Sequence, residues 1–464
     1  MQYIENRTYD EIEVGDHAEI TRTLKKDDIE LFAVLSGDVN PAHVDENFAR
    51  SDAFHKVIAH GMWGGALISA VLGTELPGPG TIYVDQSLHF RKPVGIGDTV
   101  TVRVSVREKH VTGNRITLDC LCRNQSGDVV VEGVAIVIAP TEKVRRPRAA
   151  LPEVHLHEIG ARYRQLIDAT QRLEPLRMGV VHPCDVLSLT GALEAKRQAL
   201  IVPVLVGPEA KIRKAADAAG LSLDGVEIID TPHSHAAAVR AVELARTGSV
   251  RALMKGALHT DELMSAVVDS ASGLRTERRM SHVFALDVPS YPKPLLLTDA
   301  AINICPDLLD KRDIVQNAID LAHAIAIALP KVAILSAVET INPKIHSTVE
   351  AAALCKMVDR GQIAGGIVDG PLAFDNAISR ASADAKGITS PVAGDADILV
   401  VPDLESGNML VKQLIYLSGA ESAGIVLGAR IPIVLTSRSD NVLSRLASCA
   451  LAVLLLEHSR TASK

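Results

Sequence analysis

The strongest constraint on this chain is a change of pattern at one segment that is rich in proline and basic residues. Residues 140–152 read PTEKVRRPRAALP and have neither helical nor strand periodicity. Such composition is typical of an interdomain linker, and 464 residues are too many for one ordinary hydrophobic core. A surface loop within one domain is the alternative, but the pattern differs on its two sides. We therefore predict a first domain over residues 1–140, a linker over 141–155 and a second domain over 156–464.

The first domain has one strongly apolar helix followed by strands. Residues 26–35 are apolar at helical spacing and stop at Gly37, a typical helix C-terminus. Pro41 disfavours helix at the residue before it, so residues 38–43 are expected to form a loop. A long apolar stretch over 62–72 predicts a buried helix. The pattern indicates an α+β domain in which an antiparallel meander accompanies this helix. The predicted strands cover residues 81–90, 98–109, 114–124 and 129–139.

Beyond the linker, helices alternate with short aliphatic strands. Aromatic residues make up only 3% of the chain, so aliphatic side chains must fill its cores. The alternation is typical of βαβ units and predicts a largely parallel sheet covered by helices. The length of this domain leaves room for two subdomains with a cleft between them. The predicted strands are 199–206, 332–336, 366–369, 398–402 and 431–436, and the predicted helices include 236–246, 313–329 and 409–417.

Charge and hydropathy argue against several classes of partner. The formal net charge is -8, whereas a binder of nucleic acid or of an anionic membrane usually carries a basic excess. The stretch MQYIENRTYDEIEVGD is acidic and lacks the apolar core of a signal peptide. The longest apolar runs, 451–456 and 324–329, are too short to span a bilayer. We therefore expect a cytoplasmic protein without nucleic-acid or membrane partners. Its cysteines, including Cys120 and Cys122, are expected to be reduced structural thiols rather than metal ligands.

The loop after the first predicted helix groups residue types that can hydrate a double bond. Adding water to an α,β-unsaturated thioester needs an activated water, a proton for the α-carbon and donors for the enolate oxygen. Asp38 and His43 can share one water, with Asn40 as a further polar anchor. The helix that begins at His60-Gly61 offers unpaired N–H groups to the thioester oxygen, and glycine allows close approach. On composition alone, an Asx-type turn with a solvated histidine is the alternative.

The order of these features favours the catalytic interpretation. SGDVNPAHVD followed by AHGMWGGALISA resembles the MaoC-like (R)-specific enoyl-CoA hydratases of the hot-dog fold, over roughly residues 8–140. The resemblance implies that Asp38 and His43 are the catalytic pair. It gives Asn40 a supporting position, Gly61 that of the oxyanion-hole glycine, and Ser69 that of a polar helix residue near the pair. Such domains usually pair through their sheets, which implies a homo-oligomer, a dimer or higher. A non-catalytic acyl-CoA-binding or dimerisation module is the alternative, and the intact Asp38/His43 pair argues against it.

Loops after the predicted strands of the second domain carry small and polar residues. The chain has neither a GxxxxGK(S/T) P-loop nor a GxGxxG fingerprint, so other loops must hold a nucleotide. Ligands of open α/β sheets bind at the carboxyl ends of strands, and several such loops together indicate a site there. Acyl transfer from a thioester to phosphate needs a cation for the phosphate, polarisation of the carbonyl and help for the leaving thiolate. The loops are 255–260, 369–376, 391–394, 402–408 and 436–440.

Together these segments resemble the phosphate acetyltransferase/phosphate butyryltransferase family from about residue 160 to the C-terminus. The stretches that carry the resemblance are TDAAINICPDL, LCKMVDRGQIAGGIVDGPLAFDNAIS, SPVAGDADILVVPDLESGNMLVKQL and IVLTSRSD. It implies an α/β fold of two subdomains, related to the isocitrate dehydrogenase type. It also implies that CoA thioesters and inorganic phosphate are the ligands, with no cofactor or metal beyond them.

The same resemblance assigns chemical roles near the end of the chain. Ser437 would hydrogen-bond the thiol, and Arg438 would polarise the acyl carbonyl or hold phosphate. Asp440 is the nearest candidate for the general base. The acetyltransferases have glycine after the Ser-Arg pair where this chain has Ser439, which leaves the position of the base open.

Upstream residues complete the predicted transferase site. Arg275 is a candidate phosphate ligand, with Arg278 and Arg279 as substitutes, although a solvated loop face is an equal alternative. Asp375 and Asn408 are expected in the cleft. The histidines that lack partners in the sequence are expected to be structural, and these are His233, His235, His282 and His346.

The two halves predict a bifunctional acyl-CoA enzyme. The first would hydrate a 2-enoyl-CoA to an (R)-3-hydroxyacyl-CoA, and the second would interconvert acyl-CoA plus phosphate with acyl phosphate plus CoA. Dehydrogenase chemistry is a third hypothesis for the second half, because its fold type is shared. That chemistry needs a divalent metal and a nicotinamide, which a phosphate-dependent release of thiol does not.

Overall fold

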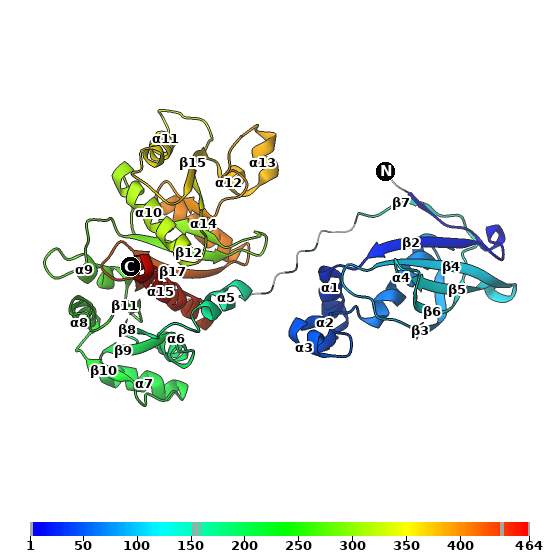
Figure 1. Ribbon diagram of the computed structural model, residues 1–464, viewed down its shortest axis with the longest axis horizontal. Coiled ribbons are helices and arrows are strands. Elements are labelled where there is room, and N and C mark those ends of the chain that lie inside the picture. Colours follow the sequence, from blue (N-terminus) through cyan, green and yellow to red (C-terminus); the bar gives the residue numbers. More distant parts are fainter. Residues whose placement is uncertain are drawn as a thin grey trace. The chain divides into compact units, whose positions relative to one another are not determined.

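Figure 1 shows the computed structural model, in which residues 3–150, 154, 156, 158, 160–436 and 440–462 are described. The chain divides into two compact units, Met1–Leu156 and His157–Lys464. The first unit has a hydrophobic core of its own, separate from the core clusters of the second. Each unit is therefore considered by itself.

Part of the predicted linker belongs to the first unit. Strand β7 (Arg145–Pro147) pairs antiparallel with β1 (Tyr3–Glu5). The buried side-chain oxygen of Asn6 accepts from the backbone N–H of Val144 at 2.9 Å. These contacts correct the interpretation of residues 141–155 as one aperiodic linker, because pairing with a distant segment gives part of it a strand register.

The first unit contains a five-stranded antiparallel sheet in the order β2-β4-β5-β6-β3. The four predicted strands are present, each end within one residue of its predicted position. Strand β2 (His17–Thr23) lies outside the predictions, because most of its side chains are exposed and give little hydrophobic pattern. Strand β3 pairs with β6 rather than with β4, so the strands are not a simple meander. The bounds are β3 (Ile82–Phe90), β4 (Thr99–His110), β5 (Arg115–Arg123) and β6 (Val129–Ile138).

Helix α4 (Gly61–Thr74) supplies the centre of the hot-dog fold. Its buried side chains, Trp63, Leu67, Ile68, Val71 and Leu72, join one core with the alternating buried valines of β4. Gly64 allows a close approach to the sheet, since a Cβ there would lie 3.0 Å from the Cγ2 atom of Val131. The long apolar run of the sequence thus becomes the core helix, as predicted.

Three shorter helices precede α4 and hold the polar loop. Helix α1 (Lys26–Ser36) ends at Gly37, whose φ of 76° is the left-handed conformation expected of a helix C-terminus. Helices α2 (Pro41–Val44) and α3 (Glu46–Ser51) follow. The segment 38–43, predicted as a loop, therefore ends in a short helix that begins at its proline.

The second unit is built on one continuous eleven-stranded sheet, in the order β10-β9-β8-β11-β18-β17-β12-β13-β16-β14-β15. Strands pair in parallel in both outer parts, whereas β18–β17, β17–β12 and β12–β13 are antiparallel. The sheet is therefore largely parallel, as expected, with an antiparallel centre. The bounds are β8 (Leu176–Val181), β9 (Ile201–Gly207), β10 (Glu227–Asp230), β11 (Ala252–Lys255), β12 (Ser281–Asp287), β13 (Leu295–Thr298), β14 (Lys331–Leu335), β15 (Ile367–Leu372), β16 (Ile398–Val400), β17 (Glu421–Leu427) and β18 (Ile433–Val434).

Helices cover this sheet and fill three connected hydrophobic clusters with aliphatic side chains. The three predicted helices correspond to α8, α10 and α14, which begin two, five and five residues earlier than predicted, and α10 also ends five residues earlier. The bounds are α5 (Ala161–Ala169), α6 (Val186–Arg197), α7 (Glu209–Ala219), α8 (Ser234–Arg246), α9 (Thr260–Val268), α10 (Leu308–Ala324), α11 (His346–Asp359), α12 (Phe374–Ile378), α13 (Arg380–Ala385), α14 (Leu404–Tyr416) and α15 (Val442–Ala462).

Helix α15 corrects the expectation that no apolar segment is long enough to cross a membrane. Its residues Val442–Thr461 meet that test by length and composition, with a mean hydropathy of 1.4. More than half of this stretch is buried inside the second unit, where Ala447, Cys449 and Leu451 are fully enclosed. The helix is part of a hydrophobic core, which explains its composition.

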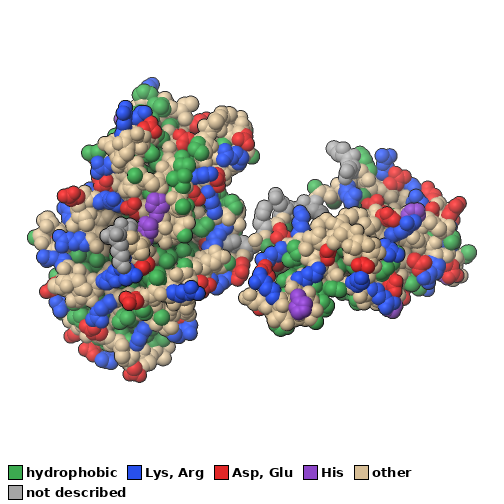
Figure 2. All heavy atoms as spheres, in the orientation of Figure 1, with side chains coloured by type: hydrophobic (Ala, Val, Ile, Leu, Met, Phe, Trp, Pro, Cys, Tyr) green, Lys and Arg blue, Asp and Glu red, His purple; other side chains and the backbone are tan. Residues whose placement is uncertain are grey.

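Charged side chains of both signs are mixed on the surface. On the face seen in Figure 2, Lys and Arg side chains are interspersed with Asp and Glu on each unit. That mixture agrees with the net charge of -8 and shows no large basic patch on that face.

Candidate active sites

The polar loop of the first unit is organised by caps and turns. The Asn40 side chain accepts from the N–H of Ala42 at 3.1 Å and caps α2, the short helix that carries His43. The Asp38 carboxylate accepts from the N–H of Asn40 at 3.2 Å. Asn40 therefore fixes the backbone geometry between the aspartate and the histidine.

Backbone carbonyls fix both imidazole rings near Asp38. The Nδ1 atom of His43 lies 2.9 Å from the carbonyl oxygen of Ile58, and the Nε2 atom of His60 lies 2.9 Å from that of Asp38. A carbonyl only accepts, so these two nitrogens carry the protons. The opposite nitrogens, Nε2 of His43 and Nδ1 of His60, therefore hold lone pairs. The Nδ1 atom of His60 is buried and has no hydrogen-bond partner among the described residues.

Asp38, His43 and His60 converge on one point. One carboxylate oxygen of Asp38 and one ring nitrogen of each histidine lie within 4.8 Å of one another. The two rings are stacked at a tilt, with centroids 4.0 Å apart. Separations of this size suit a bridging water. His60 was predicted only as the start of a helix. In the structure it forms the buried wall of the site. Its position directly before Gly61 is the only feature of the sequence that points to this role.

A cavity of about 300 Å³ opens beside these groups. His43, His60 and Gly61 line it together with apolar side chains that include Trp63 and Phe90. A Cβ atom on Gly61 would lie 3.1 Å from the Cε1 atom of Phe90, so glycine allows the close approach of ring and helix. Gly61 also begins α4, where N–H groups lack intrahelical partners. The cavity can thus hold an apolar acyl group beside an acid–base pair and a helix N-terminus.

Ser69 is not part of this arrangement. It lies on the exposed side of α4 and is not among the residues that line the cavity. Its position on α4 turns Ser69 away from the buried face of the helix.

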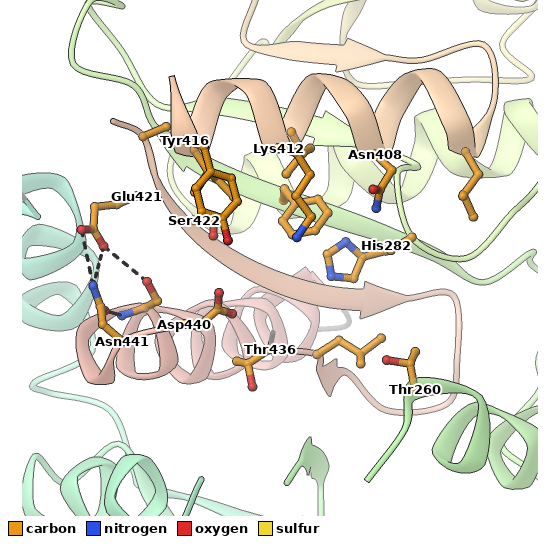
Figure 3. A pocket seen from close by; sticks show the side chains of 18 residues that line it. Thr260, His282, Asn408, Lys412, Tyr416, Glu421, Ser422, Thr436, Asp440 and Asn441 are labelled. Atoms are coloured by element: carbon orange, nitrogen blue, oxygen red, sulfur yellow. Dashed lines mark hydrogen bonds between the residues drawn. The ribbon is translucent and has the colours of Figure 1, made fainter. Parts of the chain in front are cut away.

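The second unit has a cleft of about 450 Å³ where its sheet changes from parallel to antiparallel (Figure 3). Helix α14 forms one wall, and its side chains Asn408, Lys412 and Tyr416 project from one face at helical spacing. Lys412 is the only Lys or Arg among the described residues that line the cleft. The opposite wall comes from β12, β17 and the start of α15.

Asp440 lies in this cleft, at the start of α15, as predicted. The buried guanidinium of Arg445 donates to the hydroxyl of Thr436 at 2.8 Å, and its charge acts on Asp440. Burial lowers the pKa of Arg445. Ser437 and Arg438 lie between these residues in the sequence but outside the described residues. Arg445 was not predicted as a site residue, because a charged residue on the buried side of an apolar helix only interrupts the hydrophobic pattern of the sequence.

Asn408 lies in the cleft, whereas two other candidate residues lie elsewhere. Asn408 lines the cleft and donates to the carbonyl of Ala300 at 3.3 Å. Asp375 is exposed, outside the residues that line the cleft, with Lys386 at 3.9 Å. Arg275 is exposed and lines a separate hollow, about 500 Å³ in volume. These two placements correct the predictions, because the loops that carry Asp375 and Arg275 do not bring them to the cleft.

The alternative basic residues near Arg275 are already paired. Arg278 contacts Asp320 at 2.5 Å, and the Nε atom of Arg279 donates to the amide oxygen of Asn303 at 2.6 Å. Both arginines line the separate hollow with Arg275 rather than the cleft. Neither arginine is among the residues that line the cleft.

Comparisons with known proteins agree with both halves. The phosphate acetyl/butaryl transferase family matches residues 233–453, and the MaoC like domain family matches residues 10–119. The phosphate acetyltransferase of Rhizobium meliloti is 61% identical over 302 residues, which cover 65% of this chain and 96% of that protein. This chain therefore belongs to the phosphate acetyltransferase/phosphate butyryltransferase family, with a MaoC-like domain ahead of the family domain.

Two solved structures are similar to the separate units. A branched-chain phosphotransacylase from Enterococcus faecalis is 31% identical with a TM-score of 0.54, over 61% of this chain and 99% of that chain. The R-hydratase PhaJ1 from Pseudomonas aeruginosa is 44% identical with a TM-score of 0.33, over 34% of this chain and 100% of that chain. The family matches confirm the predicted families of the two domains, and the sheets described above have the predicted fold classes.

Proposed function

We propose that this chain is a bifunctional enzyme that hydrates 2-enoyl-CoA in its first unit and transfers acyl groups between CoA and phosphate in its second. The observation that carries the first half is the convergence of Asp38, His43 and His60 beside an apolar cavity and the first turn of α4. The second half rests on family membership and on a cleft that holds Lys412 and Asp440.

The hydration step uses one water for both new bonds. The carboxylate of Asp38 and the Nε2 lone pair of His43 hold the water and take its proton as its oxygen attacks the β-carbon. Charge develops on the thioester oxygen, where N–H groups at the start of α4 stabilise it. The proton is then delivered to the α-carbon, so the product gains one hydroxyl and one hydrogen. We assign His60 a positioning role, through its hydrogen bond to the Asp38 carbonyl.

Hydration of crotonyl-CoA by the full chain tests this assignment. Asp38→Asn and His43→Ala are each expected to lower the rate roughly 10²- to 10⁴-fold, the usual size of a general acid–base contribution. His17→Ala is the matched control, since His17 is exposed on β2 and does not line the cavity. A carboxylate and two imidazoles are also donor types of a zinc site, so the assay is repeated with a chelator, which we expect to change nothing. A wild-type rate of hydration in either variant would contradict the assignment of Asp38 and His43 as the catalytic pair.

The transfer step joins phosphate to the acyl carbon. A phosphate oxygen attacks the thioester carbonyl, the carbon–sulfur bond breaks, and the thiolate leaves and takes a proton. We propose Lys412 as a cation that holds phosphate, because it faces the cleft beside Asn408. By the family resemblance, Arg438 polarises the carbonyl, Ser437 hydrogen-bonds the thiol and Asp440 serves as the base. In the reverse direction the same groups pass the acyl group from acyl phosphate to CoA.

Release of free thiol from acyl-CoA tests the second half. We expect release to depend on inorganic phosphate and to need neither a metal nor a nicotinamide. A series of straight and branched acyl-CoA substrates then gives the preferred acyl group. Thiol release that is independent of phosphate, or that requires a metal and a nicotinamide, would contradict the proposed transfer and favour hydrolysis or dehydrogenase chemistry.

A homo-oligomer is part of the proposal. Strand β3 lies at the edge of its sheet and exposes Ile82, Tyr83 and Val84 by 59%, 40% and 42%. An apolar edge strand is a template for pairing with another chain. We propose that a second copy pairs there, and that the enzyme works in the cytoplasm, where CoA thioesters and phosphate are available.

A further inference from the structure

A buried arginine lies directly behind the transferase cleft. Arg445 is in the first turn of α15, is 3% exposed and is not among the residues that line the cleft. Removing a guanidinium from water is costly, and the cost is offset only where hydrogen bonds and opposite charges surround the group. A buried arginine beside a proposed active site therefore calls for a reason, which its contacts supply.

Helix α6 leaves a slot for this side chain. Gly191 lies on the buried face of α6, and a Cβ atom there would lie 2.6 Å from the Cδ atom of Arg445 and 3.4 Å from its Cβ atom. Any larger residue at position 191 would therefore displace the arginine. The carboxylates of Asp440, in the cleft, and of Asp185, the N-cap of α6, act on its charge. The slot and these charges hold the side chain in one place.

The guanidinium reaches the residue at which the loop 436–440 begins. Its Nη1 atom donates to the hydroxyl oxygen of Thr436 at 2.8 Å. Thr436 follows β18, is 3% exposed and forms part of the cleft wall (Figure 3). In the sequence it directly precedes Ser437 and Arg438. The hydrogen bond from Arg445 therefore fixes the chain where it enters this loop.

Asn441 fixes the chain where it leaves the same loop. Its side-chain nitrogen donates to the carboxylate of Glu421 at 3.1 Å, and its side-chain oxygen accepts from the N–H of Ser444 at 2.8 Å (Figure 3). Glu421 is the first residue of β17, in the middle of the sheet. The loop is thus tied to α15 at its start, through Thr436, and to the sheet at its end.

We propose that Arg445 is a positioning residue of the transferase, which acts through Thr436 to hold the loop 436–440 in the geometry that acyl transfer needs. This inference rests on the transfer proposed above. Attack of phosphate on a thioester needs the reacting atoms aligned, and a misplacement of about 1 Å can cost roughly 10²-fold in rate. The arginine itself does not touch the reacting atoms, so its removal should slow the reaction and leave substrate binding largely as it is.

A double-mutant cycle separates this role from a general effect on folding. Arg445→Met removes the guanidinium, and Thr436→Val removes the hydroxyl with little change of shape. The two single variants and the double variant are compared with wild type. Lys311→Met is the matched control, because Lys311 is a buried cation on α10 that pairs with Glu350 and lies outside the cleft. The measurements are kcat, KM for acetyl-CoA and KM for phosphate in thiol release by the full chain, with thermal unfolding by circular dichroism.

We expect Arg445→Met and Thr436→Val each to lower kcat about ten- to hundredfold, the size of a lost hydrogen bond to a charged group. Both KM values should change less than about threefold, since alignment acts on the transition state. The double variant should be no slower than the slower single variant, because both changes break one contact. Lys311→Met should lower the unfolding temperature and keep the wild-type kcat. Thr436→Val tests the contact by itself if Arg445→Met does not fold.

Four results would overturn the inference. Losses in kcat that multiply in the double variant would show that the two residues act independently. A wild-type kcat in Thr436→Val would show that the contact has no effect on the reaction. A raised KM at unchanged kcat would assign the pair to substrate binding, and an equal loss of kcat in Lys311→Met would reduce the effect to a lost buried charge. A wild-type chain without thiol release would instead contradict the proposed transfer itself.

Discussion

At the scale of single residues, the site of the first unit relies on imidazole rings whose orientation a backbone carbonyl fixes. His43 is held by Ile58 and His60 by Asp38. In each ring the carbonyl fixes the proton on one nitrogen and leaves a lone pair on the other. The backbone therefore decides which nitrogen can take a proton or accept a hydrogen bond from a substrate.

The buried ring of His282 makes the stability of the second unit depend on pH. Its pKa falls from an ordinary value of 6.5 to about 4 in the folded chain, so the unfolded chain binds the proton more readily below pH 6.5. This contribution is fully present above pH 6.5 and is lost as the pH falls toward 4. Between pH 7 and pH 4.5, we expect wild type to lose about 2–3 kcal/mol more stability than His282→Gln. Urea unfolding followed by circular dichroism measures the difference, and equal losses would contradict it.

Lys412 gives the most direct test of the cation in the transferase cleft. Replacing it by glutamine keeps the length of the side chain and removes the charge. We expect Lys412→Gln to raise KM for phosphate roughly tenfold, the effect of losing a hydrogen bond to a charged group. KM for acetyl-CoA should change less. Exposed Lys356 on α11 pairs with Asp359, so Lys356→Gln is the control. An unchanged KM for phosphate in Lys412→Gln would assign phosphate binding to another residue.

Sequence reasoning reached some of these residues and not others, for a physical reason. Asp38, Asn40 and His43 lie within one short segment, so their spacing alone predicts a shared site. His60 joins them only because the chain folds back and stacks its ring on His43. Arg445 lies on the buried side of α15, and no local spacing of residues in the sequence predicts that position. Residues that come together only in the tertiary structure cannot be predicted as one site without knowledge of the fold.

At the scale of secondary structure, elements with a clear period were predictable, whereas two of the short buried strands were not. Helix α4 and strands β3 to β6 have long apolar or alternating patterns, and their predicted ends agree closely with the structure. Strands β12 and β13 lay outside the predictions. They are buried on both faces and read as short apolar runs without alternation, which periodicity cannot distinguish from helix. The antiparallel centre of the second sheet was therefore not predicted.

Helix α4 supports both the core of the first unit and its site. Ile68 is fully buried, and replacing it by alanine leaves a cavity under the helix. We expect Ile68→Ala to destabilise the first unit by about 2–5 kcal/mol. Trp63 is the only tryptophan in the chain and lies in α4, so its fluorescence reports unfolding of this unit. Ser69→Ala, on the exposed side of α4, should change stability by less than about 0.5 kcal/mol. Equal effects of Ile68→Ala and Ser69→Ala on stability would contradict the assignment of Ile68 to the buried face of α4 and of Ser69 to its exposed face.

At the scale of the whole molecule, the exposed edge of β3 is where we propose that two chains pair. In the part of the sheet that the structure describes, β3 pairs with β6 on one side and presents apolar side chains at its edge. A charge at this edge should oppose pairing with another copy. We expect Val84→Asp to lower the mass of the full chain in sedimentation experiments, to half if β3 makes the only contact. Val111→Asp is the control, since Val111 is exposed between β4 and β5. The same mass for wild type and Val84→Asp would rule out β3 as the interface.

The division of the chain into two units, each with its own cavity, predicts that its two reactions can be lost separately. The sites share a type of substrate but no described residue. A change in one site should therefore leave the kinetics of the other reaction as they were.

The decisive measurement is both reactions in one preparation of the full chain, as wild type and as Asp38→Asn. Crotonyl-CoA reports hydration, and acetyl-CoA with phosphate reports thiol release. We predict that wild type performs both, and that Asp38→Asn loses hydration while its phosphate-dependent thiol release stays unchanged. A wild-type chain that releases thiol but hydrates no enoyl-CoA would contradict the two-site account and leave the first unit as a binding or assembly module.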